Sequence, residues 1–372
     1  MNRRIRVLHL IDNLDLGGAQ TVLFGLLEYF DRNRFEIVLA TMHANRKSLY
    51  FGRAVELGVR LVALSPRRWL PWYLATLPWL LFRGRFDVVH SHLYASNWLG
   101  KPLAKLFRVP VVISHDHCYD RFRFDWPVIS KVDAWANGFA DWILVIANSI
   151  REELVRKERM PSEKIELMRN GLPERPFPTR PVGVRKVIGA AGRLVGWKRF
   201  DRFLRIGQQL LELDSEYQFR LAGSGPHEQS LRLLAKDLGV SEKLVWCGTV
   251  ANMADFFGSI DVFLLTSEFE DLPMILLEAM YHGVPSAAVT VNASRAEIAG
   301  DILDLDPHDT EAEWARAIHS LFQNPAAYMD LSRRGRELMK REYMAEKRAR
   351  RLENLYEELV GRRILEKQSD CR

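Results

Sequence analysis

The clearest chemical pattern in this sequence is a pair of glutamates, Glu270 and Glu278, at the two ends of the stretch EDLPMILLE. Pro273 suits the first turn of a helix and Gly283 suits its end, so we expect a helix between them. Glu270 then lies just before the helix, beside N–H groups without intrahelical partners. Glu278 lies among apolar neighbours, where a carboxylate needs a partner. The hydroxyls of a sugar or ribose would supply one, and so would a structural salt bridge.

Two cations follow a glycine-rich turn earlier in the same half of the chain. The stretch GAAGRLVGWK, residues 189–198, places Arg193 and Lys198 beside glycines at the end of a predicted strand. Arginine offers a planar fork of donors and lysine a compact charge, a combination suited to the oxygens of a diphosphate. Two solvated surface cations are the alternative interpretation of this stretch.

Two further glycine turns follow predicted strands. Gly17 and Gly18 come after the first strand and open a helix. In AGSGP, residues 222–226, Gly223 begins a pattern that resembles a dinucleotide-binding fingerprint, but Glu228 stands where the third glycine is needed. We therefore expect a tight loop there and no dinucleotide fingerprint. Ligands of open α/β sheets bind at the carboxyl ends of the strands, so these turns are candidates to line a site.

Three histidines stand at the ends of two other predicted strands. His90 and His92 are two residues apart, and His115 ends the next strand. The first two suggest a metal, but no third ligand of convincing spacing accompanies them, and histidines at strand ends are commonly neutral hydrogen-bonded groups. The one Asp-x-Asp pattern, Asp304 to Asp306, lies in a late strand and suits a structural role. We predict no metal site.

The elements that must position these residues alternate between short apolar runs and longer amphipathic ones. IRVLHLI, FEIVLATM and FDVVH are examples of the expected strands in the first half, and KVIGAAG, YQFRLAG and DVFLLT in the second. This alternation predicts two α/β domains with parallel sheets. The proline-rich stretch at 169–181 marks a boundary, and the strand-free end of the chain predicts two helices broken near Tyr343. We place the domains at 1–178 and 179–342, with a final helix at 343–372.

Composition is that of an ordinary globular protein with a small basic excess. Of the 372 residues, 48% are hydrophobic and 27% charged, and the formal net charge is +6. This charge is too small and too evenly spread to indicate a nucleic-acid binder. The three cysteines lie far apart, which argues against a disulfide framework or a zinc site and favours a cytoplasmic location. The longest apolar stretch, residues 69–82, is shorter than a spanning helix and contains two prolines.

Taken together, these segments resemble glycosyltransferase family 4, the retaining transferases of GT-B fold. The similarity covers nearly the whole chain in order: GGAQ, DVVHSHLYASNWLG, VVISHDH, VIANSIREEL, EKIELMRNGL, GRLVGWK, LAGSGP and the segment from Glu270 to Glu278. The resemblance implies two facing Rossmann-like domains, the N-terminal one for the acceptor and the C-terminal one for a nucleotide sugar. It also implies that the C-terminal helices cross back to the N-terminal domain.

The resemblance further implies a role for each candidate residue. Arg193 and Lys198 would bind the donor diphosphate, Glu270 the hydroxyls of the transferred sugar, and Glu278 the nucleotide ribose. His115 would approach the sugar from the N-terminal domain, and Gly17 and Gly18 would lie where donor phosphate and acceptor meet. Gly223, Asp271, Leu272 and Pro273 would complete the donor-binding loops. His115, Arg193, Lys198 and Glu270 would be the catalytic groups, with no metal and no cofactor beyond the UDP- or GDP-sugar donor.

The sequence departs from the family's usual motif at two positions. Asp271 and Arg199 stand where glycine is common. Aspartate tolerates unusual backbone angles, so the first turn is expected to survive the change. An added negative charge near a diphosphate raises a second hypothesis, a non-catalytic relative that binds sugar nucleotides or glycans. A sugar-nucleotide epimerase and a phosphorylase are further alternatives, because both can use facing nucleotide-binding domains.

Two stretches that mix aromatic and basic residues concern the acceptor. Residues 66–86 combine tryptophan and leucine with arginine, and residues 119–126 combine aromatic residues with arginine. Such mixtures suit a membrane interface, an anionic membrane surface and a lipid-linked acceptor. A helix whose apolar face packs on the sheet is the alternative for the first stretch. The expected function is synthesis of bacterial cell-surface polysaccharide or lipopolysaccharide in the cytoplasm, with peripheral binding at the inner membrane.

Overall fold

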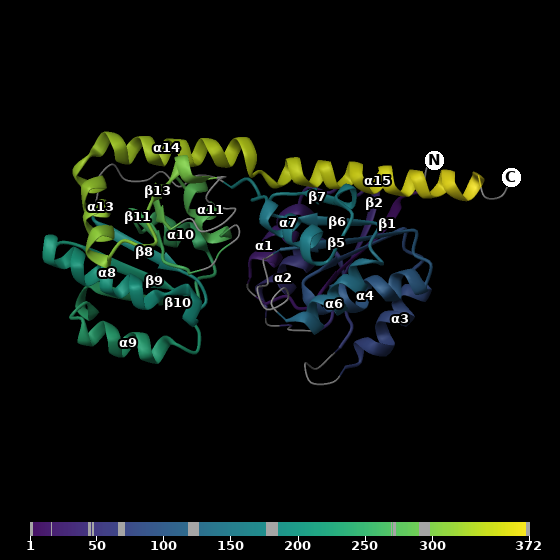
Figure 1. Ribbon diagram of the computed structural model, residues 1–372, viewed down its shortest axis with the longest axis horizontal. Coiled ribbons are helices and arrows are strands. Elements are labelled where there is room, and N and C mark those ends of the chain that lie inside the picture. The colour runs from purple at the N-terminus through teal and green to yellow at the C-terminus, as the bar shows by residue number, and fades with distance from the viewer. Residues whose placement is uncertain are drawn as a thin grey trace. The chain divides into compact units, whose positions relative to one another are not determined.

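The computed structural model describes residues 3–15, 17–43, 46, 48–65, 71–117, 126–175, 185–268, 270, 273–289 and 298–369. The chain divides into two compact units (Figure 1). The first comprises Met1–Glu174 together with Met344–Arg372, and the second comprises Arg175–Tyr343. Each unit is built on a parallel sheet with helices on its faces, so the predicted α/β class with two Rossmann-like sheets is confirmed.

The first unit has a seven-stranded sheet in the order β3-β2-β1-β4-β5-β6-β7. The order reverses between β1 and β4, which makes this pair the point where an open α/β sheet accepts ligands. Its elements, with the short 3-10 turn η1, are β1 (Ile5–Ile11), α1 (Gly18–Leu27), β2 (Phe35–Thr41), α2 (Leu49–Glu56), β3 (Arg60–Ala63), α3 (Tyr73–Gly84), β4 (Val88–His92), α4 (Tyr94–Leu106), β5 (Val111–Asp116), α6 (Pro127–Asn137), β6 (Trp142–Val145), α7 (Asn148–Lys157), η1 (Ser162–Lys164), β7 (Ile165–Leu167) and α15 (Ala345–Ser369).

The second unit has a six-stranded sheet in the order β10-β9-β8-β11-β12-β13. Here the order reverses between β8 and β11. Its elements are β8 (Val187–Ala191), η2 (Gly196–Lys198), α8 (Phe200–Leu213), β9 (Gln218–Ala222), α9 (Glu228–Asp237), η3 (Ser241–Lys243), β10 (Leu244–Gly248), α10 (Met253–Gly258), β11 (Val262–Leu265), α11 (Met274–Tyr281), β12 (Ser286–Ala288), η4 (Ala299–Asp301), β13 (Leu303–Asp304), α13 (Glu311–Gln323) and α14 (Pro325–Glu342).

The two faces of the first sheet bury different kinds of side chain. Side chains of one face, among them Leu8, Leu10 and Val89, join buried leucines of α3 in an apolar core. Because side chains alternate along a strand, the residues between them point to the opposite face. That face carries His9 and His90, both fully buried, and helix α15 contacts it through Tyr356.

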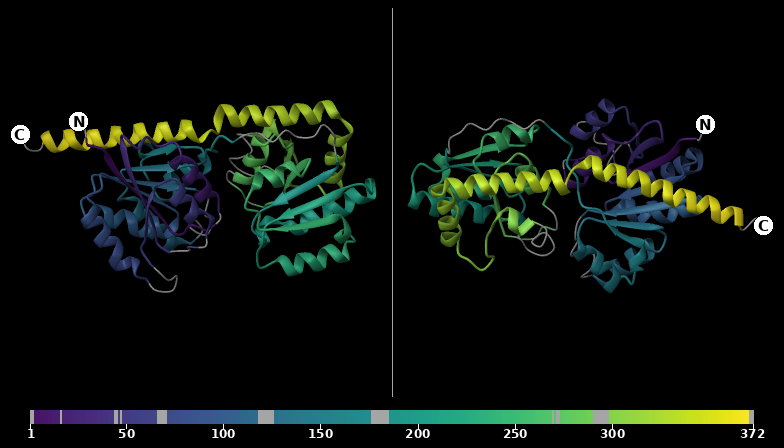
Figure 2. Two further views of the ribbon diagram at one scale, coloured as in Figure 1. Left: turned by 180° about the vertical axis from the view of Figure 1, so that it is seen from behind. Right: turned by 90° about the horizontal axis from the view of Figure 1, so that it is seen from above.

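Helix α15 belongs to the first unit although it ends the chain. The predicted break near Tyr343 is confirmed, because α14 ends at Glu342 and α15 begins at Ala345. The helix contacts α1 and β5 and runs along the first unit (Figure 2). Glu353 on its buried face accepts a hydrogen bond from the backbone N–H of Asp31 at 2.6 Å. Along the described part of the chain, no helix has the length and apolar character needed to cross a bilayer.

Candidate functional site

Most of the predicted site residues gather at the carboxyl ends of β8, β9 and β11 in the second unit. Arg193 and Lys198 follow β8, Gly223 follows β9, and Glu270 follows β11. Strands β8 and β11 are neighbours, with Phe263 opposite Gly189. The loops that leave these strands therefore start side by side at the point where the strand order reverses.

The loop after β8 rests on the loop after β9 through direct contact of their backbones. The N–H of Leu194 donates to the carbonyl of Ser224 at 3.0 Å, and the N–H of Gly192 to that of Ala222 at 3.0 Å. A Cβ on Gly223 would lie 1.9 Å from the carbonyl oxygen of Gly192, and Gly223 has φ +135°. Only glycine allows this approach. Gly223 thus supports the loop that carries the two predicted cations.

Lys198 and Glu270 form an ion pair although 72 positions separate them in the sequence. Their side chains are only 18% and 22% exposed. Two further hydrogen bonds join the same loops: Thr266 Oγ1 donates to the Lys198 carbonyl at 2.9 Å, and the Glu268 N–H donates to the Trp197 carbonyl at 2.8 Å. The pair is therefore fixed by backbone as well as by side chains. This arrangement offers one cation and one carboxylate to a common ligand.

Arg193 stands at the outer side of the same loop. It is exposed, and its guanidinium carbon lies 5.3 Å from the centre of the Trp197 ring, which is 46% exposed. Stacking on the indole holds the guanidinium while its N–H donors stay accessible. Arg199, the residue after Lys198, has φ +49° and pairs with Asp201 at 3.0 Å. Its left-handed backbone explains physically why glycine suits this position.

Glu278 lies on α11, as predicted, within a stretch whose other residues are almost all buried. Leu276, Leu277 and Ala279 are 0% exposed. Among the residues that the structure describes, the Glu278 carboxylate has no hydrogen-bond or ion-pair partner. Burial raises the pKa of Glu278 from 4.5 to about 7. An isolated carboxylate in such surroundings favours a ligand whose hydroxyls can donate to it.

Helix α11, which carries Glu278, begins one residue later than predicted and ends as predicted. Pro273 is its N-cap residue, one position before the first helical residue, and Gly283 follows its end with φ +67°. Pro273 offers no side-chain cap, and the N–H of Leu276 donates to the Pro273 carbonyl at 2.9 Å. Within the described residues, the N–H groups of Met274 and Ile275 have no partner and can bind an anion. Asp271 and Leu272, predicted for the same site, lie outside the described residues.

The predicted residues of the first unit lie at the carboxyl ends of β1 and β5. Gly17 is the extended N-cap residue of α1, and Gly18 begins that helix. His115, in β5, is 1% exposed, and neither of its ring nitrogens has a hydrogen-bond partner among the described residues. Its ring stacks on that of His117, with 4.1 Å between ring centres.

The expectation that His90 and His92 lack a third partner of suitable position is wrong. His9 in β1 lies opposite His90 in β4, and His92 lies opposite His115 in β5. Ring nitrogens of His9, His90 and His92 fall within 4.8 Å of one another, and so do those of His92, His115 and His117. Spacing along the chain could not reveal this group, because it depends on the register of separate strands. A histidine on the same face of each of three adjacent strands was the available signal.

The aromatic and basic stretch predicted to touch a membrane divides between two environments. One face of helix α3 buries Leu77, Leu80 and Leu81 in the apolar core. This agrees with the alternative interpretation, in which the apolar face of the helix packs on the sheet. The other face leaves Trp79 62% and Phe82 69% exposed. Helix α6 packs on α4, which also contacts α3. It exposes Val128 and Trp135, and its N-cap residue Trp126 is exposed as well. Residues 66–70 and 119–125 lie outside the described residues.

Comparison with known protein families gives two matches that together span most of the chain. Residues 16–174 match the family described as Glycosyltransferase Family 4. Residues 174–338 match the family described as Glycosyl transferases group 1. The two matched regions meet at residue 174, where the first compact unit gives way to the second.

Individual proteins with similar sequences carry transferase names. EpsF of Bacillus subtilis (strain 168), itself assigned as a glycosyltransferase, is 24% identical over 301 residues, which are 75% of this chain and 78% of EpsF. The Escherichia coli UDP-Gal:alpha-D-GlcNAc-diphosphoundecaprenol alpha-1,3-galactosyltransferase is 23% identical over 260 residues, 64% of this chain and 67% of that protein.

Solved structures show the same fold at lower sequence identity. The crystal structure of HepE from Anabaena in complex with UDP superposes with a TM-score of 0.81. The match covers 94% of this chain and 99% of HepE at 14% identity.

Proposed function

This chain belongs to glycosyltransferase family 4, and we propose that it moves a sugar from a nucleotide-diphosphate sugar to a hydroxyl group of a glycan or lipid-linked acceptor. UDP- and GDP-sugars are the proposed donors, and the anomeric configuration is retained. One observation carries the proposal: the Lys198–Glu270 pair is fixed at the carboxyl ends of β8 and β11, next to the helix that bears Glu278. A cation, a sugar-binding carboxylate and a ribose-binding carboxylate are the groups that such a donor requires.

Each part of the donor meets a group of matching chemistry in this proposal. Lys198 and Arg193 neutralise the diphosphate, with the first N–H groups of α11 beside them. Glu270 accepts hydrogen bonds from hydroxyls of the transferred sugar, and Glu278 accepts them from the ribose. Gly223 keeps the cation-bearing loop in place. His115, Gly17 and Gly18 contribute from the first unit.

The rate advantage comes from charge stabilisation at the leaving group. Breaking the bond between the sugar and the phosphate builds negative charge on the departing diphosphate, and preorganised cations stabilise that charge more than they stabilise the ground state. In this structure Lys198 forms an ion pair with Glu270. Donor binding supplies both residues with new partners, the phosphate oxygens for lysine and the sugar hydroxyls for glutamate. The acceptor hydroxyl then attacks on the face that the diphosphate leaves.

A thermal-shift series with purified full-length protein tests the donor site. UDP-, GDP- and ADP-sugars are added in turn to the wild type, to Glu278→Ala and to the control Glu212→Ala, which alters an exposed glutamate of the same unit. We expect one class of donor to stabilise the wild type and the control but not Glu278→Ala. Equal stabilisation of all three proteins, or no stabilisation by any nucleotide sugar, contradicts it.

Turnover assays separate transfer from the rival activities. An epimerase converts the donor without any acceptor, and a non-catalytic relative binds the donor without turnover across acceptors. A transferase releases nucleoside diphosphate faster when its acceptor is added. The E. coli relative's name includes a diphosphoundecaprenol acceptor, so a lipid-linked sugar diphosphate is the first acceptor to supply.

The exposed aromatic side chains of α3 and α6 support a membrane-associated acceptor. Trp79 and Phe82 lie close in sequence to the exposed Arg83 and Arg85, a combination that inserts into and binds an anionic interface. We expect co-sedimentation with anionic phosphatidylglycerol vesicles at low salt. The double variant Trp79→Glu/Phe82→Glu should lose it, and Leu233→Glu on α9 of the second unit should keep it. Equal sedimentation of both variants rejects this surface.

A further inference from the structure

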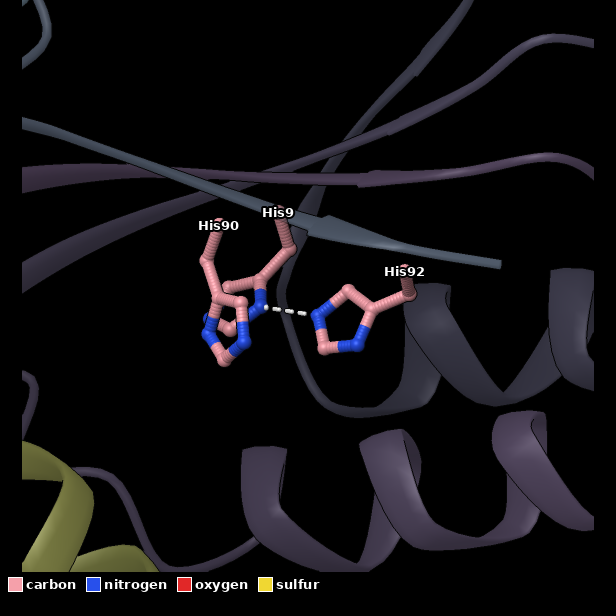
Figure 3. A group of neighbouring side chains, drawn as sticks. All are labelled: His9, His90 and His92. Atoms are coloured by element: carbon pink, nitrogen blue, oxygen red, sulfur yellow. Dashed lines mark hydrogen bonds between the residues drawn. The ribbon is translucent and has the colours of Figure 1, made fainter. Parts of the chain in front are cut away.

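A cluster of five histidines lies on the face of the first sheet that helix α15 contacts, and all of them except His115 are separate from the proposed donor site. Four of its members are fully or almost fully buried: His9, His90 and His92 are 0% exposed and His115 is 1% exposed. The fifth, His117, is partly exposed. In Figure 3 the rings of His9, His90 and His92 point to the same side of the sheet and converge. We propose that these three residues form a binding site for a divalent transition-metal ion of the zinc type.

The separations between the ring nitrogens are those of a ligand set. His9 Nδ1 and His92 Nε2 are hydrogen-bonded to each other at 3.0 Å, and ring nitrogens of all three residues lie within 4.8 Å of one another. Nitrogens on a tetrahedral zinc ion, each at about 2.0 Å from the metal, are roughly 3.3 Å apart. Small rotations of the rings therefore suffice to bring one nitrogen of each residue to a common ion.

Each of the three rings has a second nitrogen with a partner outside the set. His90 Nδ1 lies 2.7 Å from the Tyr356 hydroxyl, His9 Nε2 lies 3.4 Å from the same hydroxyl, and His92 Nδ1 lies 2.9 Å from His117 Nε2. Metal-binding histidines characteristically donate their other N–H to such a partner, which fixes the tautomer. A bound ion would replace the hydrogen bond between His9 Nδ1 and His92 Nε2, so that these two atoms and His90 Nε2 are the three ligand atoms.

His90 Nε2 supports this assignment independently. It is buried and has no hydrogen-bond partner among the described residues. A buried nitrogen without a partner costs free energy, and a metal ion would remove that cost.

The three histidine ligands determine which class of metal ion the site can bind. Imidazole nitrogens suit Zn²⁺, Co²⁺, Ni²⁺ and Cu²⁺, whereas Mg²⁺ and Ca²⁺ require oxygen ligands. The three ligands, all of them described residues, are histidines, and none is a carboxylate. Three imidazoles on a tetrahedral ion leave its fourth position to water. Because Tyr356 belongs to α15, a bound ion would link β1 and β4 to the C-terminal helix of this unit.

Cobalt binding by the full-length chain tests the site, with a protein that carries no polyhistidine tag. After treatment with a chelator and its removal, Co²⁺ is titrated and followed by the visible ligand-field absorption of a four-coordinate ion. Native mass spectrometry counts Zn²⁺ per chain. We expect one equivalent of each ion, with Zn²⁺ displacing Co²⁺ and Mg²⁺ having no effect. Failure of the wild type to bind one equivalent, or an octahedral aqueous spectrum for Co²⁺, overturns the proposal.

Variants locate the ion. His90→Gln should abolish stoichiometric Co²⁺ binding, while the exposed histidine variant His227→Gln in the second unit keeps it. Tyr356→Phe removes one oxygen and retains all three ligands. The affinity of this variant for Co²⁺ should fall by about 10- to 100-fold while the protein stays folded. Wild-type affinity in either His90→Gln or Tyr356→Phe would overturn the assignment. If His90→Gln does not fold, Tyr356→Phe alone still decides the outcome.

Discussion

Glu278 makes the most specific prediction, because its carboxylate must be ionised to bind a ribose as proposed and burial opposes that ionisation. The pKa of Glu278 is raised from 4.5 to about 7. At pH 5 only about one molecule in a hundred then carries the carboxylate, and the apparent affinity falls in proportion to the competent fraction. Binding of the nucleotide sugar should therefore be up to about 100-fold weaker at pH 5 than at pH 8, with most of the change between pH 5 and pH 7.

Isothermal titration calorimetry with the stabilising nucleotide sugar measures this change. An intact nucleotide sugar is needed, because the terminal phosphate of a free nucleoside diphosphate itself titrates near pH 6. Titrations near pH 6 in buffers of different ionisation enthalpy should reveal release of about one proton on binding. Glu278→Gln keeps the shape of the side chain and cannot ionise, so its weaker affinity should barely change with pH. A wild-type affinity as independent of pH as that of Glu278→Gln refutes the reasoning.

The raised pKa of Glu278 also predicts how the free energy of folding depends on pH. The unfolded chain ionises Glu278 near pH 4.5, whereas the folded protein retains the proton until about pH 7. Folding is therefore penalised increasingly between pH 4.5 and pH 7, and the full penalty, up to about 3 kcal/mol, is present above pH 7. Urea unfolding should find Glu278→Gln more stable than the wild type at pH 8 and equal to it near pH 4.5. Equal stability at both pH values contradicts the assignment of a desolvated carboxylate.

Three further changes probe the loops around the donor site. Lys198→Ala should lower kcat/KM by about 100- to 1,000-fold in steady-state assays, whereas Lys186→Ala, which removes a lysine paired with Asp214 and Glu216, should leave it unchanged. Gly223→Ala should lower the free energy of urea unfolding by at least about 2 kcal/mol, because the added Cβ would clash with a backbone oxygen. The control Gly248→Ala should lower it by about 1 kcal/mol, because Gly248 has φ +61° but no atom near the added Cβ. Arg199→Gly should be no less stable than the wild type, and Arg199→Val should lose about 1 to 2 kcal/mol more than Arg199→Gly, because a β-branched residue suits φ +49° poorly.

Features encoded by neighbouring residues could be predicted from the sequence. The strand IRVLHLI, the helix bounded by Pro273 and Gly283, and the break at Tyr343 all depend on local patterns of apolar residues and on residues that start or stop helices. The alternation of strands and helices also indicated parallel sheets. The carboxyl ends of parallel strands lie at the same edge of a sheet. The predicted parallel sheet therefore placed the loops of Lys198 and Glu270 at the same edge.

Features set by pairing between distant segments could not be predicted in this way. His9 meets His90 only because β1 and β4 pair in one particular register, which the spacing of the histidines does not encode. The ion pair between Lys198 and Glu270 likewise depends on the order β8-β11 and on the loop contacts through Thr266. The stacking of Arg193 on Trp197 depends on the backbone of one short turn. The sequence therefore did not predict which of the candidate residues touch.

Hydrogen–deuterium exchange of the full chain can show whether the second unit binds a nucleotide-diphosphate sugar between the loops after β8 and β11. With a saturating nucleotide sugar we expect slower exchange at residues 192–198 and at 273–282, and no such protection in Lys198→Ala/Glu278→Ala under the same conditions. Slower exchange confined to other segments, or equal protection in the double variant, would contradict this expectation.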